Sequence, residues 1–158
     1  MTKIPMTKEG KRRLQEELDE LKKVERPKVV DEIETARAHG DLSENAEYHA
    51  AKEKQSFVEG RIQELQAKIS NAQVIDVGSL SGDRVMFGAT VTLYDFDKDE
   101  EVTYKIVGDD ESDIKDNKIS YASPIAKALI GKEVAQEVQI KTPGGTRTFE
   151  IVEVEFIE

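Results

Sequence analysis

The connection between two long helical patterns decides the fold of this chain. It reads Ala38-His39-Gly40-Asp41-Leu42-Ser43-Glu44-Asn45-Ala46-Glu47-Tyr48. On both sides of it, apolar residues recur every three or four positions, as on one face of a helix. A connection this short places consecutive helices side by side and antiparallel. The sequence therefore predicts an antiparallel coiled-coil hairpin, with arms of about 30 residues that extend roughly 45 Å.

The two predicted helices carry different apolar patterns. The face before the connection comprises Leu14, Leu18, Leu21, Val24, Val30 and Ile33, and the heptad seam after it comprises Val58, Ile62, Leu65, Ile69 and Ala72. Thr7 is the expected N-cap of the first helix. Pro27 lies inside the first pattern, where it removes a helical hydrogen bond, so we expect a kink near Glu25 and Arg26.

Beyond Asn71 the apolar period changes from that of a helix to that of a strand. The predicted strands cover residues 84–94, 102–107, 118–121, 138–141 and 148–157. Ser123 and Pro124 open one short helix as N-cap and first residue, and Gly131 stops it. The fold class is therefore α+β, with a helical hairpin at residues 1–75 and an antiparallel sheet with one short helix at residues 76–158.

The charge of the chain is concentrated in its second half. Residues 1–75 carry 14 Lys+Arg against 15 Asp+Glu, whereas residues 76–158 carry 9 against 18, a net charge of −9. Such a surface repels free nucleic acid and favours a basic protein partner, although solubility alone could explain it. No cysteine, apolar leader or membrane-length apolar run occurs, which predicts a cytoplasmic protein with no membrane association.

Two carboxylates in the connection, Asp41 and Glu44, have two interpretations. They fit a capping box, with Asp41 as N-cap of the second helix and Glu44 bonding back to it. They also suit Mg²⁺, which is commonly bound by one or two carboxylates while substrate phosphates and water complete the octahedron. Both interpretations can hold. A zinc site at His39 and His49 is disfavoured, since their spacing is not that of a zinc-binding pair.

Six ordered motifs make the whole chain resemble the bacterial Gre transcript cleavage factors, of the GreA type. They lie at residues 4–7, 36–48, 70–76, 106–111, 123–126 and 141–145. The resemblance implies an FKBP-like second domain. It also implies a monomeric transcription elongation factor whose hairpin enters the secondary channel of a backtracked bacterial RNA polymerase.

The same resemblance assigns roles to individual residues. Asp41 and Glu44 would help to hold a Mg²⁺ shared with the polymerase, which itself cleaves the nascent RNA, so the protein is not an enzyme alone and has no cofactor of its own. Arg37 and Lys52 would face the RNA 3′ end, and Asn45 and Tyr48 would support the tip. Ser123 and Pro124 would lie where the second domain docks on the rim helices of the channel. Ala122 departs from the polar residue that often precedes them.

Three other functions remain open from the sequence. An FKBP-like domain could act as a prolyl isomerase or chaperone, although such a pocket needs aromatic residues that the core also requires. A coiled-coil assembly module would form a homodimer and would not depend on Asp41. An inhibitory Gre paralogue would occupy the same channel, but the presence of both Asp41 and Glu44 argues against it.

Overall fold

The computed structural model describes residues 3–40 and 45–158. The chain forms two compact units: Lys11–Ala72, and Lys3–Gly10 together with Gln73–Glu158. The sequence placed the boundary at residues 75 and 76, and it placed the N-terminal segment with the hairpin. Lys3–Gly10 instead belongs to the C-terminal unit, because strand β1 (Ile4–Thr7) pairs with strand β2 (Ala72–Ile75).

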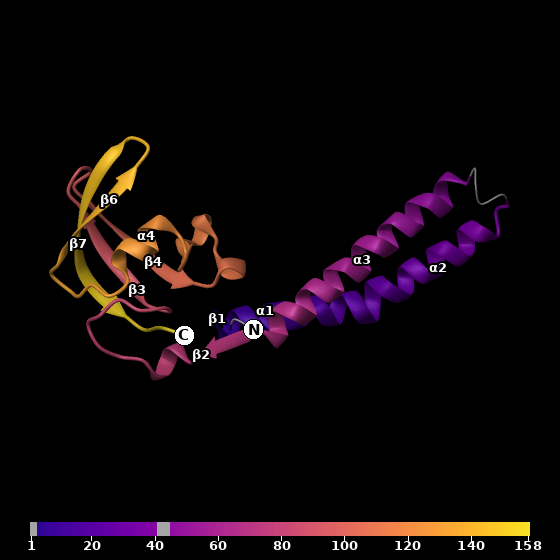
Figure 1. Ribbon diagram of the computed structural model, residues 1–158, viewed down its shortest axis with the longest axis horizontal. Helices are drawn as coiled ribbons and strands as arrows, with labels where there is room; N and C mark the ends of the chain where they lie inside the picture. The colour runs from indigo at the N-terminus through magenta and orange to yellow at the C-terminus, as the bar shows by residue number, and fades with distance from the viewer. Residues whose placement is uncertain (1–2, 41–44) are drawn as a thin grey trace. The chain divides into compact units, whose positions relative to one another are not determined.

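The first unit is a helical hairpin. Its first arm contains α1 (Lys8–Glu20), a π-helical turn at Leu21–Glu25 and α2 (Arg26–Arg37), and its second arm is α3 (Ala46–Ser70). Helices α2 and α3 run side by side (Figure 1). Val58, Ile62 and Leu65 are buried, as the heptad pattern predicts. None of the described helices is long and apolar enough to cross a membrane.

The π-helical turn changes the apolar face of the first arm. The N–H of Arg26 donates to the carbonyl of Leu21, five residues back, and Pro27 lies in the first turn of α2. Proline lacks an N–H and cannot donate a helical hydrogen bond, and the wider π-helical turn accommodates this loss. A π-helical turn contains more residues than an α-helical turn, so the apolar seam is shifted along the sequence. It continues at Val29, which is fully buried. The prediction that Val24 and Val30 lie on the core face is wrong, since they are 47% and 40% exposed.

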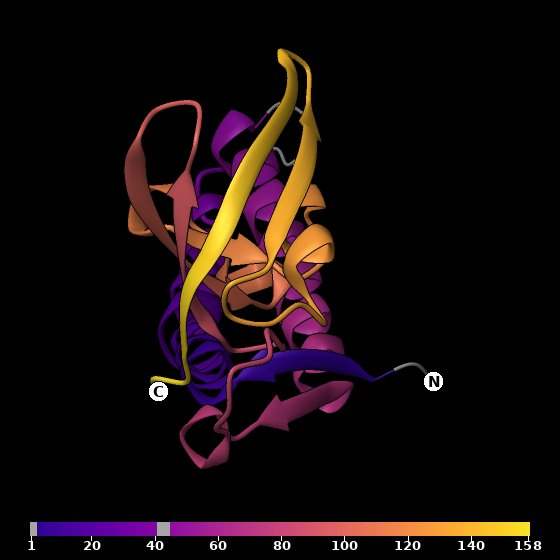
Figure 2. The same cartoon turned by 90° about the vertical axis from the view of Figure 1, so that its left-hand side faces the viewer.

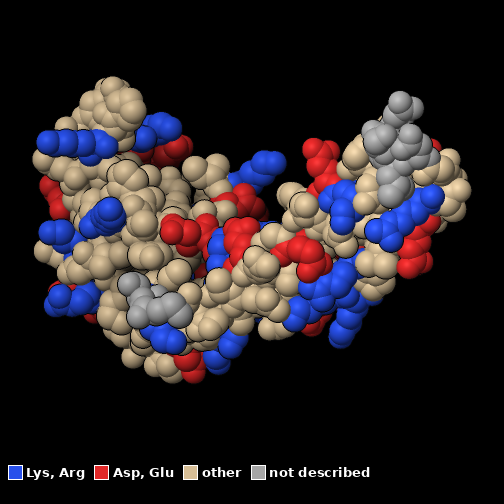
Figure 3. Space-filling model, turned by 45° about the vertical axis from the view of Figure 1, so that its right-hand side comes forward, with Lys and Arg blue, Asp and Glu red and all other residues tan. Residues whose placement is uncertain are grey.

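Ion pairs join the two arms of the hairpin on either side of its apolar seam. Arg26 makes two hydrogen bonds of 2.8 Å to Glu59, and Arg61 makes bonds of 2.6 and 2.9 Å to Glu17. In Figure 3, basic and acidic side chains are interspersed along the arm. The hydrogen bonds from Arg61 lower the pKa of Glu17, and those from Arg26 lower the pKa of Glu59.

We expect the Glu17–Arg61 pair to stabilise the hairpin in a pH-dependent way. Its lowered pKa means that the Glu17 carboxylate adds stability above its ordinary pKa of 4.5, and this stability is lost as the pH falls below that value. Glu17→Gln should lower helix stability by up to about 1 kcal/mol at pH 7, since solvent screens the pair. Thermal unfolding followed by circular dichroism at pH 7 and pH 3 measures this. The effect should be smaller at pH 3 than at pH 7, and Glu53→Gln, an exposed control on α3, should change the stability at neither pH.

The C-terminal unit is built on a five-stranded curled sheet. Its strands are β3 (Thr90–Asp95), β4 (Glu100–Val107), β5 (Lys118–Ser120), β6 (Glu137–Thr142) and β7 (Gly145–Glu155), in the order β5-β4-β3-β7-β6. The short helix α4 (Pro124–Leu129) packs beside β6 (Figure 2). Ser123 caps α4, and its hydroxyl accepts the N–H of Ala126 at 3.3 Å, as the sequence predicts.

Two details of the sheet differ from the sequence prediction. Strands β4 and β5 are parallel, because the connection between them crosses over through two short 3₁₀ turns, Asp109–Glu111 and Ile114–Asp116. The strand predicted from residue 84 begins only at Thr90. Gly88 has a φ of +88° in the turn before it, a conformation that interrupts an extended strand. Residue 84 instead makes an isolated bridge to Glu133.

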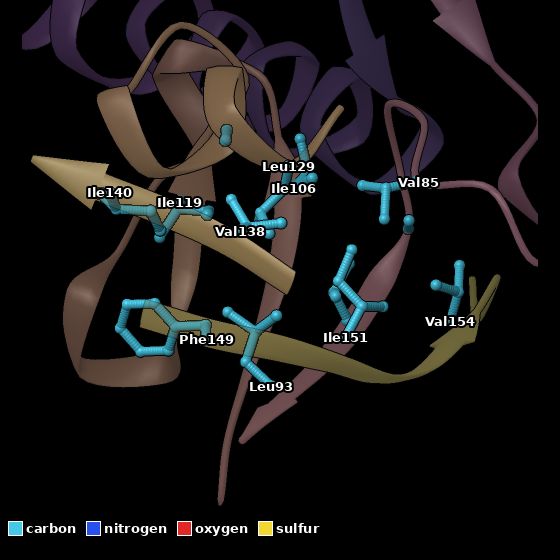
Figure 4. Packing of buried hydrophobic residues seen from close by; sticks show 13 residues of the cluster. Val85, Leu93, Ile106, Ile119, Leu129, Val138, Ile140, Phe149, Ile151 and Val154 are labelled. Atoms are coloured by element: carbon cyan, nitrogen blue, oxygen red, sulfur yellow. The ribbon is translucent and has the colours of Figure 1, made fainter. Parts of the chain in front are cut away.

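One apolar cluster holds the C-terminal unit together (Figure 4). Strand β3 alternates strictly, with Val91 and Leu93 buried against the cluster. Leu129 of α4 and Phe149 and Ile151 of β7 complete its centre. The arrangement confirms the predicted α+β class, with a helical hairpin followed by a curled sheet and one short helix.

Thr7 links the start of α1 to the 3₁₀ turn at Asp109–Glu111 within the C-terminal unit. Its hydroxyl accepts the N–H of Gly10 at 3.1 Å, which confirms the predicted N-cap, and donates to the carboxylate of Glu111. The same carboxylate accepts the N–H of Thr7 at 3.1 Å and that of Gly108 at 3.0 Å. A Cβ on Gly10 would clash with the Glu111 carboxyl group, so a larger residue there would displace this carboxylate.

We expect Thr7→Val to destabilise the C-terminal unit by about 1–3 kcal/mol. Valine preserves the shape of the side chain but leaves the Gly10 N–H and one oxygen of Glu111 without their partner. Urea unfolding followed by circular dichroism measures the loss. Thr146→Val, at an exposed position on β7, is the matched control. Equal midpoints for the two variants would contradict this role of Thr7.

Candidate functional site

The described residues at the end of the hairpin show how the connection is anchored. Helix α2 ends at Arg37 with Ala38 as C-cap, and Gly40 has a φ of +117°. Helix α3 begins at Ala46, and its N-cap is Asn45. The cap that the structure describes for this helix is therefore Asn45. The predicted capping box of Asp41 and Glu44 lies outside the described residues.

Asn45 joins the two arms through both ends of its side-chain amide. Its Oδ1 accepts the N–H of Tyr48 at 3.0 Å, which satisfies one of the free donors at the start of α3. Its Nδ2 donates to the carbonyl of Ala36 at 2.6 Å, near the end of α2. The Asn45 side chain thus satisfies one backbone donor at the start of α3 and one backbone acceptor near the end of α2. The two hydrogen bonds fix the distance between the two helix ends that the connection joins.

Two further contacts cross the hairpin at the same level. His39 Nδ1 lies 3.0 Å from Glu47 Oε2. The guanidinium of Arg37 lies 6.0 Å from the centre of the Tyr48 ring, at the outer limit of a cation–π contact. The sequence did not predict the His39–Glu47 pair. Its only sequence signal is that the two residues flank the connection.

The two basic residues predicted to face RNA lie on the same side of the hairpin end. Arg37 contacts Tyr48, and Lys52 follows Tyr48 by one helical turn on α3, which places it on the same face. The ammonium of Lys52 donates to Gln55 Oε1 at 3.1 Å. Both cations are therefore near the connection and partly solvated.

Small residues form the packing between the arms near the hairpin end. A groove of about 560 Å³ runs along it, and its lining includes Ala36, Ala50 and Ala51. Ala36 and Ala51 are buried between the arms. Small side chains therefore make the buried contact between the arms near the connection, with an open groove beside them.

The possible metal-ligating side chains of the described residues show whether they could hold a metal ion by themselves. Within residues 3–40 and 45–158, no group of three or more His, Asp or Glu side chains could hold a metal ion. Glu47 is paired with His39, and Asn45 is engaged in capping. Asp41 and Glu44 are not among the residues that this finding covers.

The predicted docking residues lie in the other unit. Ser123 and Pro124 form the N-terminus of α4, after the edge strand β5. Their local role is to start this helix.

Family models match both units. The model described as "Transcription elongation factor, N-terminal" covers residues 4–74, and "Transcription elongation factor, GreA/GreB, C-term" covers residues 80–156. The chain belongs to the GreA/GreB family. The family resemblance stated from six sequence motifs is confirmed.

Curated relatives of this GreA/GreB family member extend along its whole length. Transcription elongation factor GreA of Hyphomonas neptunium is 60% identical over 98% of both chains, and that of Legionella pneumophila (strain Corby) is 60% identical over 99% of both. Among solved structures, GreA factor homolog 1 of Thermus thermophilus is 28% identical, with 97% of this chain and 99% of that chain covered and a TM-score of 0.44. The chain is thus a transcription elongation factor of the GreA type.

Proposed function

We propose that this protein stimulates the intrinsic cleavage of backtracked nascent RNA by bacterial RNA polymerase, and so rescues arrested complexes. The hairpin enters the secondary channel and carries Asp41 and Glu44 to the polymerase active site. The chemistry is performed by the polymerase, and this chain lends it ligands.

The observation that supports the proposal most is the position of the two acids in the chain. They lie in a connection of four undescribed residues, between Gly40 and Asn45, at the end of a hairpin whose two arms Asn45 holds together. Helices joined by so short a connection expose it farthest from the body of the hairpin, where another molecule can receive it.

Asp41 and Glu44 are the residues that would hold Mg²⁺ jointly with the polymerase. The ion would supply charge stabilisation of the attacking and leaving oxygens and activation of water. The two carboxylates, Asp41 and Glu44, lie close together in the sequence. Asn45 limits how far the ends of the connection that carries them can move. Two carboxylates alone bind Mg²⁺ weakly, so the free protein should need no cofactor.

The remaining residues fit auxiliary roles in the same complex. Arg37 and Lys52 provide positive charge beside the connection, where an extruded RNA 3′ end would pass. Tyr48 supports Arg37, and Ser123 and Pro124 lie on the C-terminal unit, which we propose docks on the rim helices of the channel. A monomer suffices for all of these contacts, and a cytoplasmic location follows from the partner.

Cleavage of RNA in a stalled, backtracked bacterial polymerase complex tests the proposal. Addition of this protein should release short 3′ fragments faster than polymerase alone, and the restored complex should resume elongation. Binding without cleavage would instead assign the protein to the inhibitory paralogues. Failure to bind polymerase would reject the proposal and return the hairpin to a structural role.

Prolyl isomerisation has less support. A groove of the C-terminal unit, beside strand β5, is lined by serine, aspartate, lysine and isoleucine. Phe149, one of the candidate pocket aromatics, is buried in the core instead. A peptide isomerisation assay should therefore show no activity.

A further inference from the structure

One phenylalanine of the hairpin is held on the surface. Phe57 lies in the middle of α3 and is 74% exposed, whereas the next residue, Val58, is buried in the seam between the arms. A helix fixes the direction of each side chain, so the burial of Val58 keeps Phe57 out of the seam. The hairpin therefore exposes an aromatic ring whose burial against a partner is favourable.

Phe57 continues the face of α3 that lines the groove near the hairpin end. Ala50 and Lys54 line this groove, whose volume is about 560 Å³. Phe57 follows Lys54 by three positions and Ala50 by seven. These spacings place all three side chains on one face of the helix. The groove and the exposed ring thus belong to one surface of the hairpin.

The groove offers an apolar lining, and charged groups beside it are paired within the chain. Among the lining residues are small ones, such as Ala51, that are buried between the arms. The ammonium of Lys54 lies 3.2 Å from the carboxylate of Glu32, and Glu47 Oε2 lies 3.0 Å from His39 Nδ1. A partner of opposite charge within the chain weakens the attraction of each group for a charged ligand. The groove therefore favours an apolar group from its partner.

The distance of this surface from the connection decides what covers it. Phe57 follows Ala46, the first residue of α3, by 11 positions, which corresponds to about 16 Å along the helix axis. In the proposed function the connection reaches the polymerase active site, so this stretch of the arm lies inside the secondary channel. The wall of the channel is then the molecule that faces Phe57 and the groove.

We propose that Phe57 and the groove form a contact surface for the wall of the secondary channel, which places an apolar side chain against the Phe57 ring. The inference rests on the proposed function, and it assigns a binding role to one face of the arm, separate from the acids in the connection. Aromatic side chains that become buried at an interface often carry much of its binding energy. The contact should hold the arm at one depth in the channel and slow its dissociation.

Phe57→Ala tests the proposal in the full chain. We expect its Kd for backtracked polymerase complexes to rise by about tenfold, equivalent to about 1.4 kcal/mol. Its cleavage rate at saturating protein should equal that of the wild type, because the connection is unchanged. The matched control is Val30→Ala, which should leave the Kd unchanged. Val30 is an exposed apolar residue one turn after Arg26, on the flank of the Arg26–Glu59 pair, and it does not line the groove. Both variants should keep the helicity of the wild type in circular dichroism, since alanine favours a helix.

A photo-crosslinking amino acid at position 57 identifies what faces the ring. In the backtracked complex it should link to a polymerase subunit. Unchanged affinity of Phe57→Ala, an equal loss of affinity in Val30→Ala, or crosslinks only to RNA or to a second copy of this chain would overturn the inference. If the wild type binds polymerase and stimulates cleavage in those cases, the proposed function stands. If the wild type does not bind polymerase, both fail.

Discussion

Asp41→Asn should reduce stimulated RNA cleavage by about 100-fold at limiting Mg²⁺, which is the size of effect seen when one electrostatic contact to a transition state is lost. Asparagine has nearly the same shape as aspartate, but it removes the negative charge that favours a divalent cation. Glu44→Gln should have a similar effect. The double variant should be little worse than either single one, because both residues serve the same ion.

The measurement is the single-turnover rate of 3′-fragment release across a range of Mg²⁺ concentrations. If the carboxylates act as ligands, each variant should shift the Mg²⁺ dependence to higher concentration while its affinity for polymerase remains. Glu53→Gln, an acidic residue on the arm and outside the connection, is the control. A loss of rate with an unchanged Mg²⁺ dependence would argue against a ligand role for these acids.

Asn45→Ala should have the second largest effect, because one substitution removes both contacts that anchor the connection. Loss of the cap on α3 and of the hydrogen bond to Ala36 should cost about 2–3 kcal/mol of local stability. Looser ends should also place the two acids less accurately, and we expect cleavage to fall by at least about tenfold, since small misplacements are costly in catalysis.

Asn45→Asp separates the two contacts. Aspartate can still accept the N–H of Tyr48 and suits a helix N-terminus, but it cannot donate to the Ala36 carbonyl. It should therefore retain helicity in circular dichroism and still lose part of the cleavage activity. Full activity in Asn45→Asp would show that the cap alone matters and that the link to α2 does not.

The parts of the fold that follow from local periodicity were predictable from the sequence. The seam through Val58, Ile62 and Leu65 repeats regularly, and the cap at Ser123 precedes a proline that favours a helix start. The position of Val29 was not predictable in the same way. Its burial depends on the π-helical turn at Leu21–Glu25, which shifts the phase of every later residue in the arm.

The candidate site also has parts that the sequence predicts and parts that it does not. Asp41 and Asn45 are both good N-cap residues, and the sequence pattern favoured the earlier one because Glu44 follows at the capping-box distance. Only the three-dimensional position of the Ala36 carbonyl gives Asn45 a second partner. The contact between Thr7 and Glu111 joins residues 104 apart in the chain, and no local pattern indicates such a pair.

The pairing of β1 with β2 has a consequence for how such proteins can diversify. These strands immediately precede and follow the helical hairpin, so the chain departs from the C-terminal unit and rejoins it through neighbouring strands. The hairpin is therefore an insertion between two paired strands of the chain, β1 and β2. Its length and the chemistry of its connection can change by recombination at these two strands, while the C-terminal unit keeps the same core.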